Sequence, residues 1–574
     1  MATLLDRRPR RSDVRKLDKD WTCPEPLADE ADAVDAALGK RGLTRDELLN
    51  PYAGSPSGMH GRELAADLLL DGVRSGGRIL VFGDYDADGV CSTALATRGF
   101  RAAVARAGGH PGQVVWMVPQ RGDGYGLNKA AIRGMAQAGI EILVTVDNGT
   151  NSAYEVALAK QLGMTVIVTD HHPVKSARVA QPDALVNPAH PESTCGLSDL
   201  CGAGVVYSLL EAMADRGGLD MDPAWLGLVA TATVADVVPM LGRNRSLVKE
   251  GMTQIYEVAG LRELARSAKV RRLDEQALAF DIGPRLNAVG RMGDPRDAVR
   301  LLLTDTPAKA MAMAMKVEQY NDERKVVQAE ALALAQQLCE GLDDDAKAIV
   351  LWDERIPAGI AGVVAGRLAE AYGRPAIIGQ SDPKTGLIRG SARAAGGVSC
   401  IDLFEAAKDV LVSGGGHAHA SGFSLRTEDG EQFRELIVAA AAVAMPNAPA
   451  NRLAIDAHLK RLLRPAEVKS LQDLAPWGQG VRPPTYVSSG LFGKVVSCSA
   501  GGYTVLDFTD GASRFPGFSF TPVEVGEGEL ISVAYRFDAG RGLRVEGIGP
   551  SLLAGVVEVA GLEDEPAHSA AGAA

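Results

Sequence analysis

Short apolar runs alternate with Ala- and Leu-rich stretches between residues 60 and 255. The runs read RILVFG, VVWMVP, IEILVTV, MTVIVT and DALVN. Strands that alternate with helical segments are typical of βαβ units, so this α/β region is predicted to form a doubly wound parallel sheet. Ligands of such sheets bind beyond the carboxyl ends of the strands. The polar residues that follow each run are therefore the first candidates for a functional site.

The remainder of the chain predicts three further parts. Helix-forming residues without Gly or Pro fill MAMAMKVEQYNDERKVVQAEALALAQQL, which indicates a long helix that joins two domains. A second, smaller α/β unit follows, and beyond residue 450 short Gly-rich strands predict a β-barrel. The expected divisions are an N-terminal extension (1–55), a catalytic domain (56–255), a helical connector (256–345), a second α/β domain (346–447), an OB-fold-like barrel (448–552) and a disordered tail (553–574).

The composition limits which cellular compartment and which binding partners are expected. The 574 residues are too many for one hydrophobic core. The net charge of −12 argues against a surface that coats DNA nonspecifically, but it is compatible with a local basic groove. The seven cysteines form no CxxC pair, which favours a reducing, cytoplasmic compartment and argues against a structural zinc site. The sequence has no signal-peptide core and no run of 18 apolar residues, so no membrane span is expected.

Three carboxylates follow the first apolar run at alternate positions. Asp84, Asp86 and Asp88 lie in GDYDADG, where a strand is expected to give way to a tight turn. Carboxylates this close repel one another, so a bound cation or a set of hydrogen-bond donors is needed to hold them. The same motif begins a calcium EF-hand loop, but Leu95 occupies the twelfth position, where that loop needs Glu.

Similar polar clusters follow the later runs. EILVTV is followed by Asp147, and MTVIVT by Asp170 and the tandem His171–His172. Asp236 lies in a further apolar stretch, LGLVATATVADVVPM, which we also interpret as a strand end. Asp and His side chains from four strand ends are expected to converge on one crevice.

Carboxylates with imidazole, and without thiolate, favour hard or borderline divalent cations, with Mn²⁺ or Mg²⁺ preferred. The cluster offers more ligands than one ion needs, and a shared carboxylate such as Asp147 would bridge two ions about 4 Å apart. Such a pair polarises a phosphoryl oxygen, lowers the pKa of a bound water and neutralises the leaving oxygen. The predicted reaction is hydrolysis of a phosphoester.

The motifs GDYDADG, VDNG, TDHHP and VADVVP resemble the four motifs of the DHH phosphoesterase superfamily. GPRLNAVGRM, GSARAAGG, GGGHAHASGFS and AIDAHL with LAPWGQG resemble, in order, motifs of its RecJ branch of single-strand-specific exonucleases. The resemblance implies an enzyme of DNA repair and recombination that degrades single-stranded DNA from the 5′ end to mononucleotides, with manganese or magnesium. It also implies that the second α/β domain, the DHH-associated domain, faces the metal site across a cleft.

The resemblance further implies roles for individual residues. The family's metal ligands fall on Asp84, Asp86, Asp88, Asp147, His171 and Asp236. His172 is implied to contact the scissile phosphate and stabilise its developing charge, so His172, Asp147 and Asp236 form the expected catalytic set. The implied partners are single-stranded DNA and a single-strand-binding protein or helicase, and we expect a monomer.

A second group of residues is expected to hold the DNA. Arg285, Arg291 and Arg393 lie in what we interpret as Gly-rich loops, where guanidinium groups reach phosphates bidentately, and a surface salt bridge is the alternative for each. Arg121 is a candidate for the 5′-terminal phosphate, and Tyr125 either stacks on a base or is structural. The nucleic-acid candidates are Arg121, Tyr125, Arg285, Asn287, Arg291, Ser391, Arg393 and His417.

Two stretches depart from the family pattern. IPAG (356–359) stands where many RecJ-like chains have a WHxG-like stretch, and Val481 stands where the family often has Asn. Two other functions remain as alternatives. One is a DHH phosphodiesterase acting on short oligonucleotides or cyclic dinucleotides, and the other is a replication scaffold without catalysis. The chain carries a barrel beyond the two domains that the former needs, and the intact carboxylates argue against the latter.

Overall fold

The computed structural model describes residues 21–552, except 53, 121–125, 176–178, 343–345, 446–452, 500–502, 521–522, 524, 527 and 539–540. The described residues form two compact units. One contains 45–445 and 474–482, and the other contains 21–44, 453–473 and 483–552. The predicted disordered tail, 553–574, lies outside the described residues. Among the residues described, no helix has both the length and the apolar character needed to cross a membrane.

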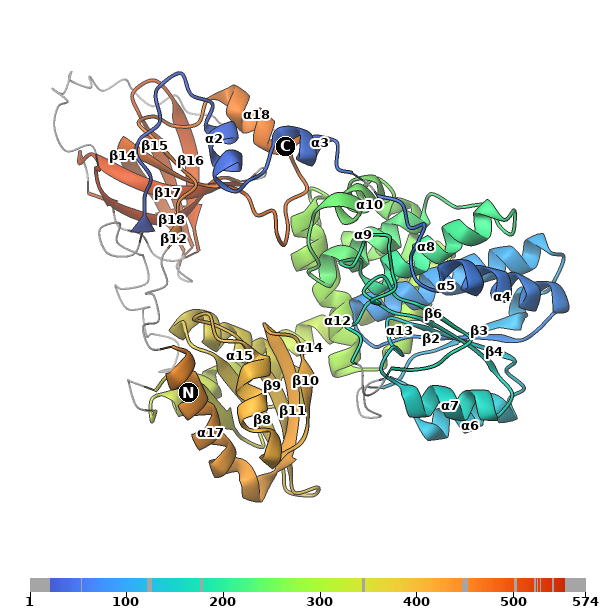
Figure 1. Ribbon diagram of the computed structural model, residues 1–574. Coiled ribbons are helices and arrows are strands. Elements are labelled where there is room, and N and C mark those ends of the chain that lie inside the picture. The colour runs from blue at the N-terminus through green and yellow to red at the C-terminus, as the bar shows by residue number, and fades with distance from the viewer. Residues whose placement is uncertain are drawn as a thin grey trace. The chain divides into compact units, whose positions relative to one another are not determined.

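The first sheet is the parallel sheet that the sequence predicted (Figure 1). Its order is β3-β2-β4-β5-β6, and every neighbouring pair is parallel. The strands are β2 (Ile79–Phe82), β3 (Val114–Met117), β4 (Ile142–Val146), β5 (Thr165–Thr169) and β6 (Ala184–Val186). Because all five strands run the same way, their carboxyl ends lie at one edge of the sheet.

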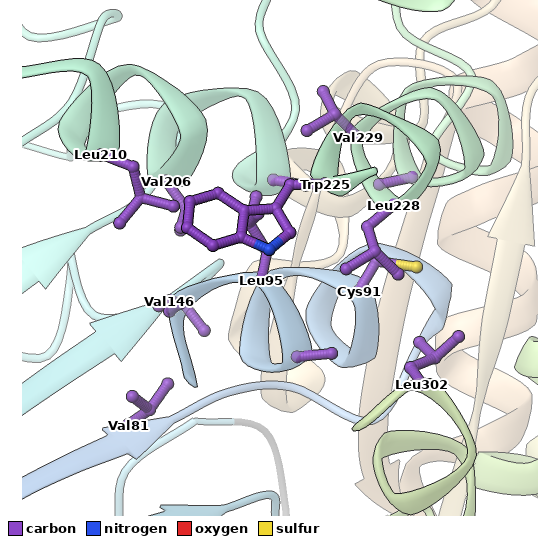
Figure 2. Packing of buried hydrophobic residues seen from close by; sticks show 14 of the residues in the cluster. Val81, Cys91, Leu95, Val146, Val206, Leu210, Trp225, Leu228, Val229 and Leu302 are labelled. Carbon is purple, nitrogen blue, oxygen red and sulfur yellow. The ribbon is translucent and has the colours of Figure 1, made fainter. Parts of the chain in front are cut away.

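Helices cover both faces of this sheet, so its strands are apolar on both sides. One core contains Val81 of β2 and the helices α4 (Arg62–Ser75), α5 (Ala87–Arg106) and α8 (Gly202–Asp215). The opposite core contains Leu80 and the helices α6 (Lys129–Gln137) and α7 (Ala153–Gln161). Figure 2 shows Leu95 of α5 between the sheet residues Val81 and Val146 and the indole of Trp225. This packing fixes the strand ends.

A helical region follows, and two predictions about it are wrong. The stretch before Asp236 is not a strand but helix α9 (Trp225–Ala235), and residues 280–295 are not a loop but largely a π-helix, Ala277–Ile282, and α12 (Gly283–Met292). α9 misled the prediction because it is buried on all sides and shows no helical periodicity. The long connecting helix is confirmed as α14 (Pro307–Cys339). The other helices are α10 (Gly242–Met252), α11 (Ala259–Ser267) and α13 (Arg296–Leu303).

The second α/β domain contains a mixed five-stranded sheet of order β10-β11-β9-β8-β7. Only β7 and β8 are parallel, and the other neighbours are antiparallel. Its elements are β7 (Ile349–Trp352), α15 (Ala358–Tyr372), β8 (Ala376–Asp382), β9 (Leu387–Arg393), α16 (Cys400–Ala406), β10 (Leu411–Gly416), β11 (Ala420–Arg426) and α17 (Gly430–Ala444). α15 packs on one face, while α16 and α17 pack on the other.

The other unit contains the predicted β-barrel, and five of its strands close on themselves. The ring runs β14-β15-β16-β18-β17 and returns to β14 through an antiparallel pairing. Its strands are β14 (Thr485–Cys498), β15 (Thr504–Thr509), β16 (Arg514–Ser519), β17 (Ile531–Asp538) and β18 (Gly542–Pro550), with β13 (Ala457–Leu459) beside β14. Closure removes the free sheet edges that would otherwise invite association.

Part of the region interpreted as an N-terminal extension is built into the barrel unit. β1 (Trp21–Thr22) pairs in parallel with β12 (Leu453–Ala454). α2 (Ala33–Lys40) contacts α18 (Pro465–Asp473) and β13, and Arg41 forms an ion pair with Asp456. The short α3 (Arg45–Leu49) lies in the first unit. Residues more than 400 positions apart therefore form one hydrophobic and ionic unit.

Residues 474–482 leave the barrel unit and pack on the first unit around a buried arginine. The guanidinium of Arg245, which is fully buried, donates to the carbonyl oxygens of Leu48, Leu474 and Pro476. Val481, the residue that departs from the family pattern, is buried, and its backbone exchanges hydrogen bonds of 3.0 and 3.2 Å with Gly478. The turn is therefore satisfied by backbone groups alone.

Candidate metal centre and substrate surface

The carboxyl ends of three parallel strands bring the predicted acidic residues together. Asp84 and Asp86 follow β2, Asp147 follows β4, and His171 lies two positions after β5. Asp88 lies in the first turn of α5. These side chains come from separate segments of the chain, yet they meet at one edge of the sheet.

Asp236 reaches the same place from a helix rather than from a fourth strand. It is the residue at which α9 ends, and Val237 follows it with a φ of 60°. A β-branched residue in the left-handed region is rare. The chain therefore turns sharply away directly after it delivers this carboxylate.

His171 lies at the centre of the cluster. Its Nε2 is 3.2 Å from Asp147 Oδ1, 3.8 Å from Asp236 Oδ2 and 3.9 Å from Asp88 Oδ2. Asp147 also belongs to a second group whose ligand atoms lie within 4.8 Å of one another. That group consists of Asp84, Asp86 and Asp147. The six residues predicted as metal ligands thus form overlapping groups around one point.

Helix N-termini hold the first carboxylates in place. Asp86 caps α5 by accepting a hydrogen bond of 2.9 Å from Gly89 N. Asp88 accepts hydrogen bonds of 2.6 and 2.9 Å from Gly202 N and Ala203 N at the start of α8. A Cβ at Gly89 would lie 2.6 Å from Asp84 Cβ, so only glycine fits this turn. The dipoles of both helices favour negative charge here.

Asp147 adopts a strained backbone. Its φ is 60°, in the left-handed region that non-glycine residues rarely occupy, and its N–H donates to Thr169 O at 3.0 Å. A Cβ at Gly202 would lie 2.7 Å from Asp147 Cβ, so α8 begins directly against this residue. Strain of this kind persists where the surrounding structure imposes it, and it clusters at functional sites.

The cluster has too little positive charge for its carboxylates. Burial raises the pKa of Asp88, and burial and neighbouring carboxylates raise the pKa values of Asp147 and Asp236 well above their usual range. Burial lowers the pKa of His171, which keeps its ring neutral and able to act as a ligand. A divalent cation would relieve this repulsion.

The donor set fits Mn²⁺ or Mg²⁺. It consists of carboxylate oxygens with one imidazole, and burial raises the pKa values of the nearby thiols of Cys91 and Cys201 far above neutrality, so no thiolate competes. Two groups could each hold a cation. They are Asp88 with His171 and Asp236, and Asp84 with Asp86 and Asp147.

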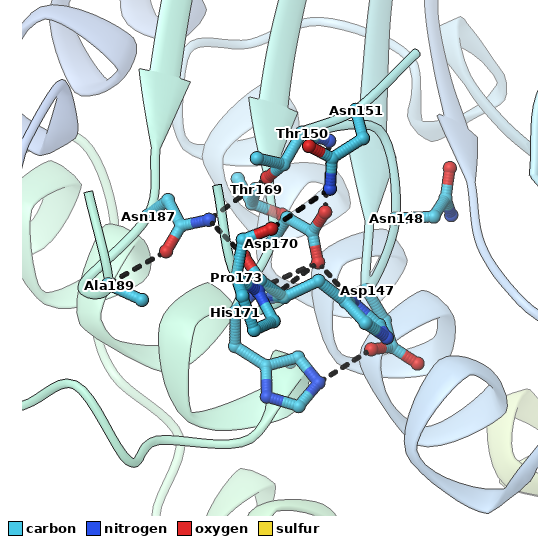
Figure 3. Close-up of polar contacts among 12 residues, drawn as sticks. Asp147, Asn148, Thr150, Asn151, Thr169, Asp170, His171, Pro173, Asn187 and Ala189 are labelled. Atoms are coloured by element: carbon cyan, nitrogen blue, oxygen red, sulfur yellow. Dashed lines mark hydrogen bonds and ion pairs between the residues drawn. The ribbon is translucent and has the colours of Figure 1, made fainter. Parts of the chain in front are cut away.

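Asp170 has a role that the sequence analysis did not assign. Its carboxylate accepts hydrogen bonds from the backbone N–H groups of Thr150, His171 and His172, and its Oδ1 lies 2.7 Å from His172 Nδ1 (Figure 3). Burial raises the pKa of Asp170, but the hydrogen bond and charge of His172, the charge of His171 and the Thr150 N–H together lower it further, so the carboxylate is ionised. Burial lowers the pKa of His172, but Asp170 raises it to about 9. Asp170 is a positioning residue for His172.

Two asparagines complete this support. Asn187 Nδ2 donates to Thr150 Oγ1 at 2.9 Å and to His172 O at 3.0 Å. Asn148 Nδ2 donates to Val146 O at 2.8 Å, which closes the turn after β4. The only sequence signal for these roles is an Asn at or just beyond a strand end.

The DNA-binding candidates on α12 are occupied by protein contacts. Arg285 forms a two-pronged pair with Glu318, with Nε–Oε2 at 2.6 Å and Nη2–Oε1 at 2.9 Å. Asn287 Oδ1 accepts a hydrogen bond of 3.0 Å from Ala87 N, and Arg291 donates to the carbonyl of Gly359 in IPAG. For Arg285 the alternative, a salt bridge, is what the structure shows.

Ser391 and Arg393 lie on strand β9, not in a loop as the sequence suggested. Residues 389, 391 and 393 share one face of this strand because side chains alternate. Burial lowers the pKa of Arg393, and among the described residues no carboxylate forms an ion pair with it. His417 follows β10, and its ring centroid lies 6.2 Å from that of His172. Arg121 and Tyr125 lie outside the described residues.

The chain matches two family models. The model of the DHH family, N-terminal domain, matches residues 78–233, and the DHHA1 domain matches residues 345–443. The single-stranded-DNA-specific exonuclease RecJ of Salmonella typhimurium is 33% identical over 455 residues, which cover 75% of this chain and 78% of that protein. RecJ of Bacillus subtilis is 32% identical over 384 residues, which cover 66% of this chain and 47% of that protein. The chain thus spans about half the length of the Bacillus relative.

Solved structures of RecJ from Thermus thermophilus have the same architecture. The structure with Mn²⁺ matches with a TM-score of 0.75 and 29% identity, covering 97% of this chain and 81% of that one. The structure with Mg²⁺ matches with a TM-score of 0.70 and 27% identity, covering 92% and 78%. The ions in these two structures, Mn²⁺ and Mg²⁺, suit the oxygen-rich cluster around His171.

Proposed function

This chain belongs to the RecJ family of single-stranded-DNA-specific exonucleases, and from this premise we propose that it is a metal-dependent exonuclease acting on single-stranded DNA. It hydrolyses phosphodiester bonds from the 5′ end and releases mononucleotides, with Mn²⁺ or Mg²⁺ as cofactor. The family membership supports the substrate and the polarity. The oxygen-rich cluster, and the Mn²⁺ and Mg²⁺ bound by the Thermus protein, support the cofactor.

The observation that carries this proposal is the position of His171 among three carboxylates. Packing does not explain why a neutral imidazole lies within 4 Å of Asp88, Asp147 and Asp236, because the acids are buried and repel one another. Bound cations would polarise the phosphodiester and activate a water molecule there. We assign Asp84, Asp86, Asp88, Asp147, His171 and Asp236 to their coordination.

His172 is proposed to contact the scissile phosphate. Its Nδ1 is engaged by Asp170 at 2.7 Å, and Asn187 holds its backbone carbonyl, so the ring has a fixed orientation. The His172 ring centroid lies 4.7 Å from that of His171, so a phosphate bound at the metal centre comes within reach of this imidazole. Donors fixed before the reaction stabilise charge that develops in the transition state.

The second α/β domain offers a surface for the strand. Arg393 and Ser391 share a face with Gly422 of β11, which is opposite Ser391, and Gly415 of β10 is opposite Gly422. Glycines on a strand face let a sugar–phosphate backbone approach closely. His417, in the turn after β10, completes the set. We propose that Ser391, Arg393 and His417 contact DNA, together with Arg121 and Tyr125, whereas Arg285 and Asn287 hold the fold.

The barrel, considered by itself, also carries features of a single-strand platform. Tyr503, Phe518 and Phe520 form an aromatic cluster in which Tyr503 stacks on Phe518 with ring centroids 6.0 Å apart and Phe520 meets Phe518 edge to face at 5.5 Å. Phe520 is 53% exposed. Arg541 and Arg544 lie over the rings of Phe518 and Phe520. Aromatic rings with arginines bind single strands without regard to sequence.

The cellular setting is part of the same proposal. The seven free cysteines support a reducing, cytoplasmic compartment. We propose a monomer that receives its substrate from a helicase or from a single-strand-binding protein in repair and recombination.

A single assay tests the function. The purified chain with Mn²⁺ is given long single strands labelled at either end, oligomers of a few nucleotides, and duplexes. Mononucleotides from the long strand, with the 5′ label released first, are expected. Cleavage of the short oligomers alone would favour the smaller-substrate phosphodiesterase, release of the 3′ label first would reverse the polarity, and no product from any substrate would leave a scaffold.

A further inference from the structure

Two imidazoles and a carboxylate meet at the edge of the first sheet, apart from the candidate metal centre. His60 directly precedes the turn into α4, while His190 and Glu192 lie in the segment after β6. The two rings are nearly parallel, with centroids 3.8 Å apart and an interplanar angle of 15°. His60 Nδ1 lies 3.4 Å from Glu192 Oε2. One ligand atom from each of the three residues lies within 4.8 Å of the others.

Burial favours the neutral form of the His60 ring, which is the form that binds a metal. Two stacked imidazolium ions would repel each other, and burial together with His190 lowers the pKa of His60, although Glu192 opposes this. His190 Nδ1 accepts a hydrogen bond of 3.2 Å from Glu192 N, so binding through this nitrogen would replace that hydrogen bond with a bond to the ion. Neutral imidazoles of this kind are the commonest protein ligands of transition metals.

We propose that His60, His190 and Glu192 form a second metal site, suited to Zn²⁺. Two imidazoles, one carboxylate and a water are an established tetrahedral donor set for this ion. Ligand atoms on one tetrahedral zinc lie about 3.3 Å apart at bonds of about 2.0–2.1 Å. The three ligand atoms therefore have to close by at most about 1.5 Å. Because the two rings are stacked face to face, one ring also has to turn so that both in-plane lone pairs point at the ion, and partly exposed rings and an exposed glutamate have the freedom to do this.

The surroundings leave room for the fourth ligand. The three residues line a cavity of about 600 Å³, together with Met59, Leu64 and Asp183. Water therefore has access to the open position. The sequence contains no CxxC pair, so this site would use histidines where structural zinc sites often use cysteines.

The two metal sites differ in the cation that they favour. The cluster around His171 is dominated by carboxylate oxygens, whereas imidazole supplies two of the three protein ligands here. Imidazole shifts preference from Mn²⁺ and Mg²⁺ toward Zn²⁺, in line with the general order of divalent affinities. The second site is thus expected to fill with zinc at concentrations where Mg²⁺ remains at the first.

An ion at this site would clamp a segment that supports His172. His60 forms an antiparallel backbone bridge with Asn187, and Asn187 Nδ2 donates to His172 O. Thr194 N also donates to Gly58 O at 2.9 Å, so residues 58–60 and 187–194 already lie side by side. Zinc would add a strong crosslink between these two segments.

Zinc titration of the full chain tests the site. Asp147→Asn and His171→Asn are introduced first, because they remove one ligand from each of the two groups of the candidate metal centre and so isolate the second site. Calorimetry on this metal-stripped protein should show uptake of one zinc ion. His60→Ala or His190→Ala should weaken that uptake by at least about tenfold, the scale of a lost metal-site partner. His110→Ala is the matched control, because the exposed His110 precedes β3 at the opposite edge of the sheet.

Hydrogen exchange provides a second readout that does not depend on catalysis. Zinc should slow exchange across residues 187–195 in the otherwise unaltered chain but not in His190→Gln, which keeps the size of the side chain if His60→Ala fails to fold. No zinc uptake, or uptake that His60→Ala, His190→Ala and His190→Gln leave unchanged, would overturn the proposal. The nuclease assay is independent of these results, so the site and the proposed activity can fail separately.

Discussion

The carboxyl edge of the first sheet and the β9–β11 face of the second α/β domain are opposite in charge and in construction. At the first, carboxylates crowd around one neutral imidazole, and burial and neighbouring carboxylates raise the pKa values of Asp147 and Asp236. At the second, the Arg393 guanidinium lies beside Gly362 of α15, and among the described residues no carboxylate forms an ion pair with it. A phosphodiester with bound divalent ions would supply positive charge to the first region and negative charge to the second. The difference teaches how the proposed function would divide its work, with the chemistry at the first region and the polyanion held at the second.

Arg285 sharpens the contrast, because it looks like Arg393 in the sequence but not in the structure. Both lie in Gly-rich motifs, yet Arg285 is already paired through two prongs with Glu318. A guanidinium whose donors are used by a carboxylate has little left for phosphate. The division of labour therefore predicts different consequences for the two arginines.

The largest effect is expected at the metal centre. Asp147→Ala should lower the rate of hydrolysis by at least about 10³-fold, because metal ions contribute several kcal/mol to transition-state stabilisation and each 1.4 kcal/mol is about tenfold. Its thermal unfolding midpoint should stay unchanged or rise, since a buried, repelled carboxylate is removed. Asp199→Ala, an exposed acid of the same domain, is the control. Near-normal turnover in Asp147→Ala would show that this edge of the sheet does not take part in hydrolysis.

A smaller loss of activity is expected from a residue that supports the metal-binding cluster without belonging to it. Asp170→Asn should reduce kcat by about 10–100-fold, as is usual for residues that orient a metal-site group. The affinity for Mn²⁺, measured by calorimetry, should change little, because Asp170 contacts His172 and backbone amides. If Mn²⁺ affinity and kcat fell together, Asp170 would be a ligand and not a positioning residue.

Arg285→Ala should affect stability and leave DNA binding intact. Breaking a charge-assisted, two-pronged hydrogen bond to the partly buried Glu318 is expected to cost about 1.5–3 kcal/mol of unfolding free energy. Urea unfolding measures that loss, and filter binding at several salt concentrations measures DNA affinity. A reduced salt dependence in this variant would place Arg285 on the phosphate path and erase the contrast with Arg393.

Arg393→Ala should show the reverse pattern. Each phosphate contact on single strands contributes about 0.7 to the slope of log affinity against log salt, so this variant should lose about that much slope. Its unfolding free energy should change less than that of Arg285→Ala, because no carboxylate is left unpaired. An unchanged slope would remove Arg393 from the DNA surface.

The smallest effect is expected in the pH dependence of the unfolding free energy, measured on metal-free protein in EDTA. His172 has a pKa of about 9 in the folded chain against 6.5 when unfolded, so its proton stabilises the fold fully below about pH 6.5 and less as pH rises through 9. Unfolding free energy should therefore fall between about pH 7 and pH 10 more steeply in the parent chain than in His172→Gln. Parallel curves for the two proteins would contradict the Asp170–His172 ion pair.

The acidic edge of the first sheet was predictable because the order of apolar runs and acidic residues along the sequence is enough to place these acids. Asp84 and Asp147 directly follow apolar runs, and parallel strands deliver such residues to one edge. Asp236 was assigned to the right cluster through the wrong element, since Thr and Val suggest a strand and a helix buried all round lacks periodicity. Asp170 escaped assignment because a carboxylate's partner depends on three-dimensional geometry.

Helix α12 shows why glycine can suggest a loop wrongly when only its neighbours in the sequence are considered. Gly and Pro in GPRLNAVGRM suggested a loop that presents arginines, yet Pro284 lies in the first turn of the helix and Gly290 lies where a Cβ would come within 2.4 Å of Tyr85 O. The glycine permits close packing against the turn after β2. Such a requirement arises from a neighbour 200 residues away, as the hydrogen bond from Ala87 N to Asn287 confirms.

The loop of residues 474–482 has a consequence for anyone who shortens this protein. A version truncated before residue 453 would lose the barrel and, with it, the carbonyls of Leu474 and Pro476 that surround the guanidinium of Arg245. An enclosed charge stripped of those acceptors is costly, so a minimal nuclease without the barrel would need Arg245 replaced by an apolar side chain or the loop grafted back. Retention of the barrel is thereby tied to the stability of the unit that carries the acidic cluster.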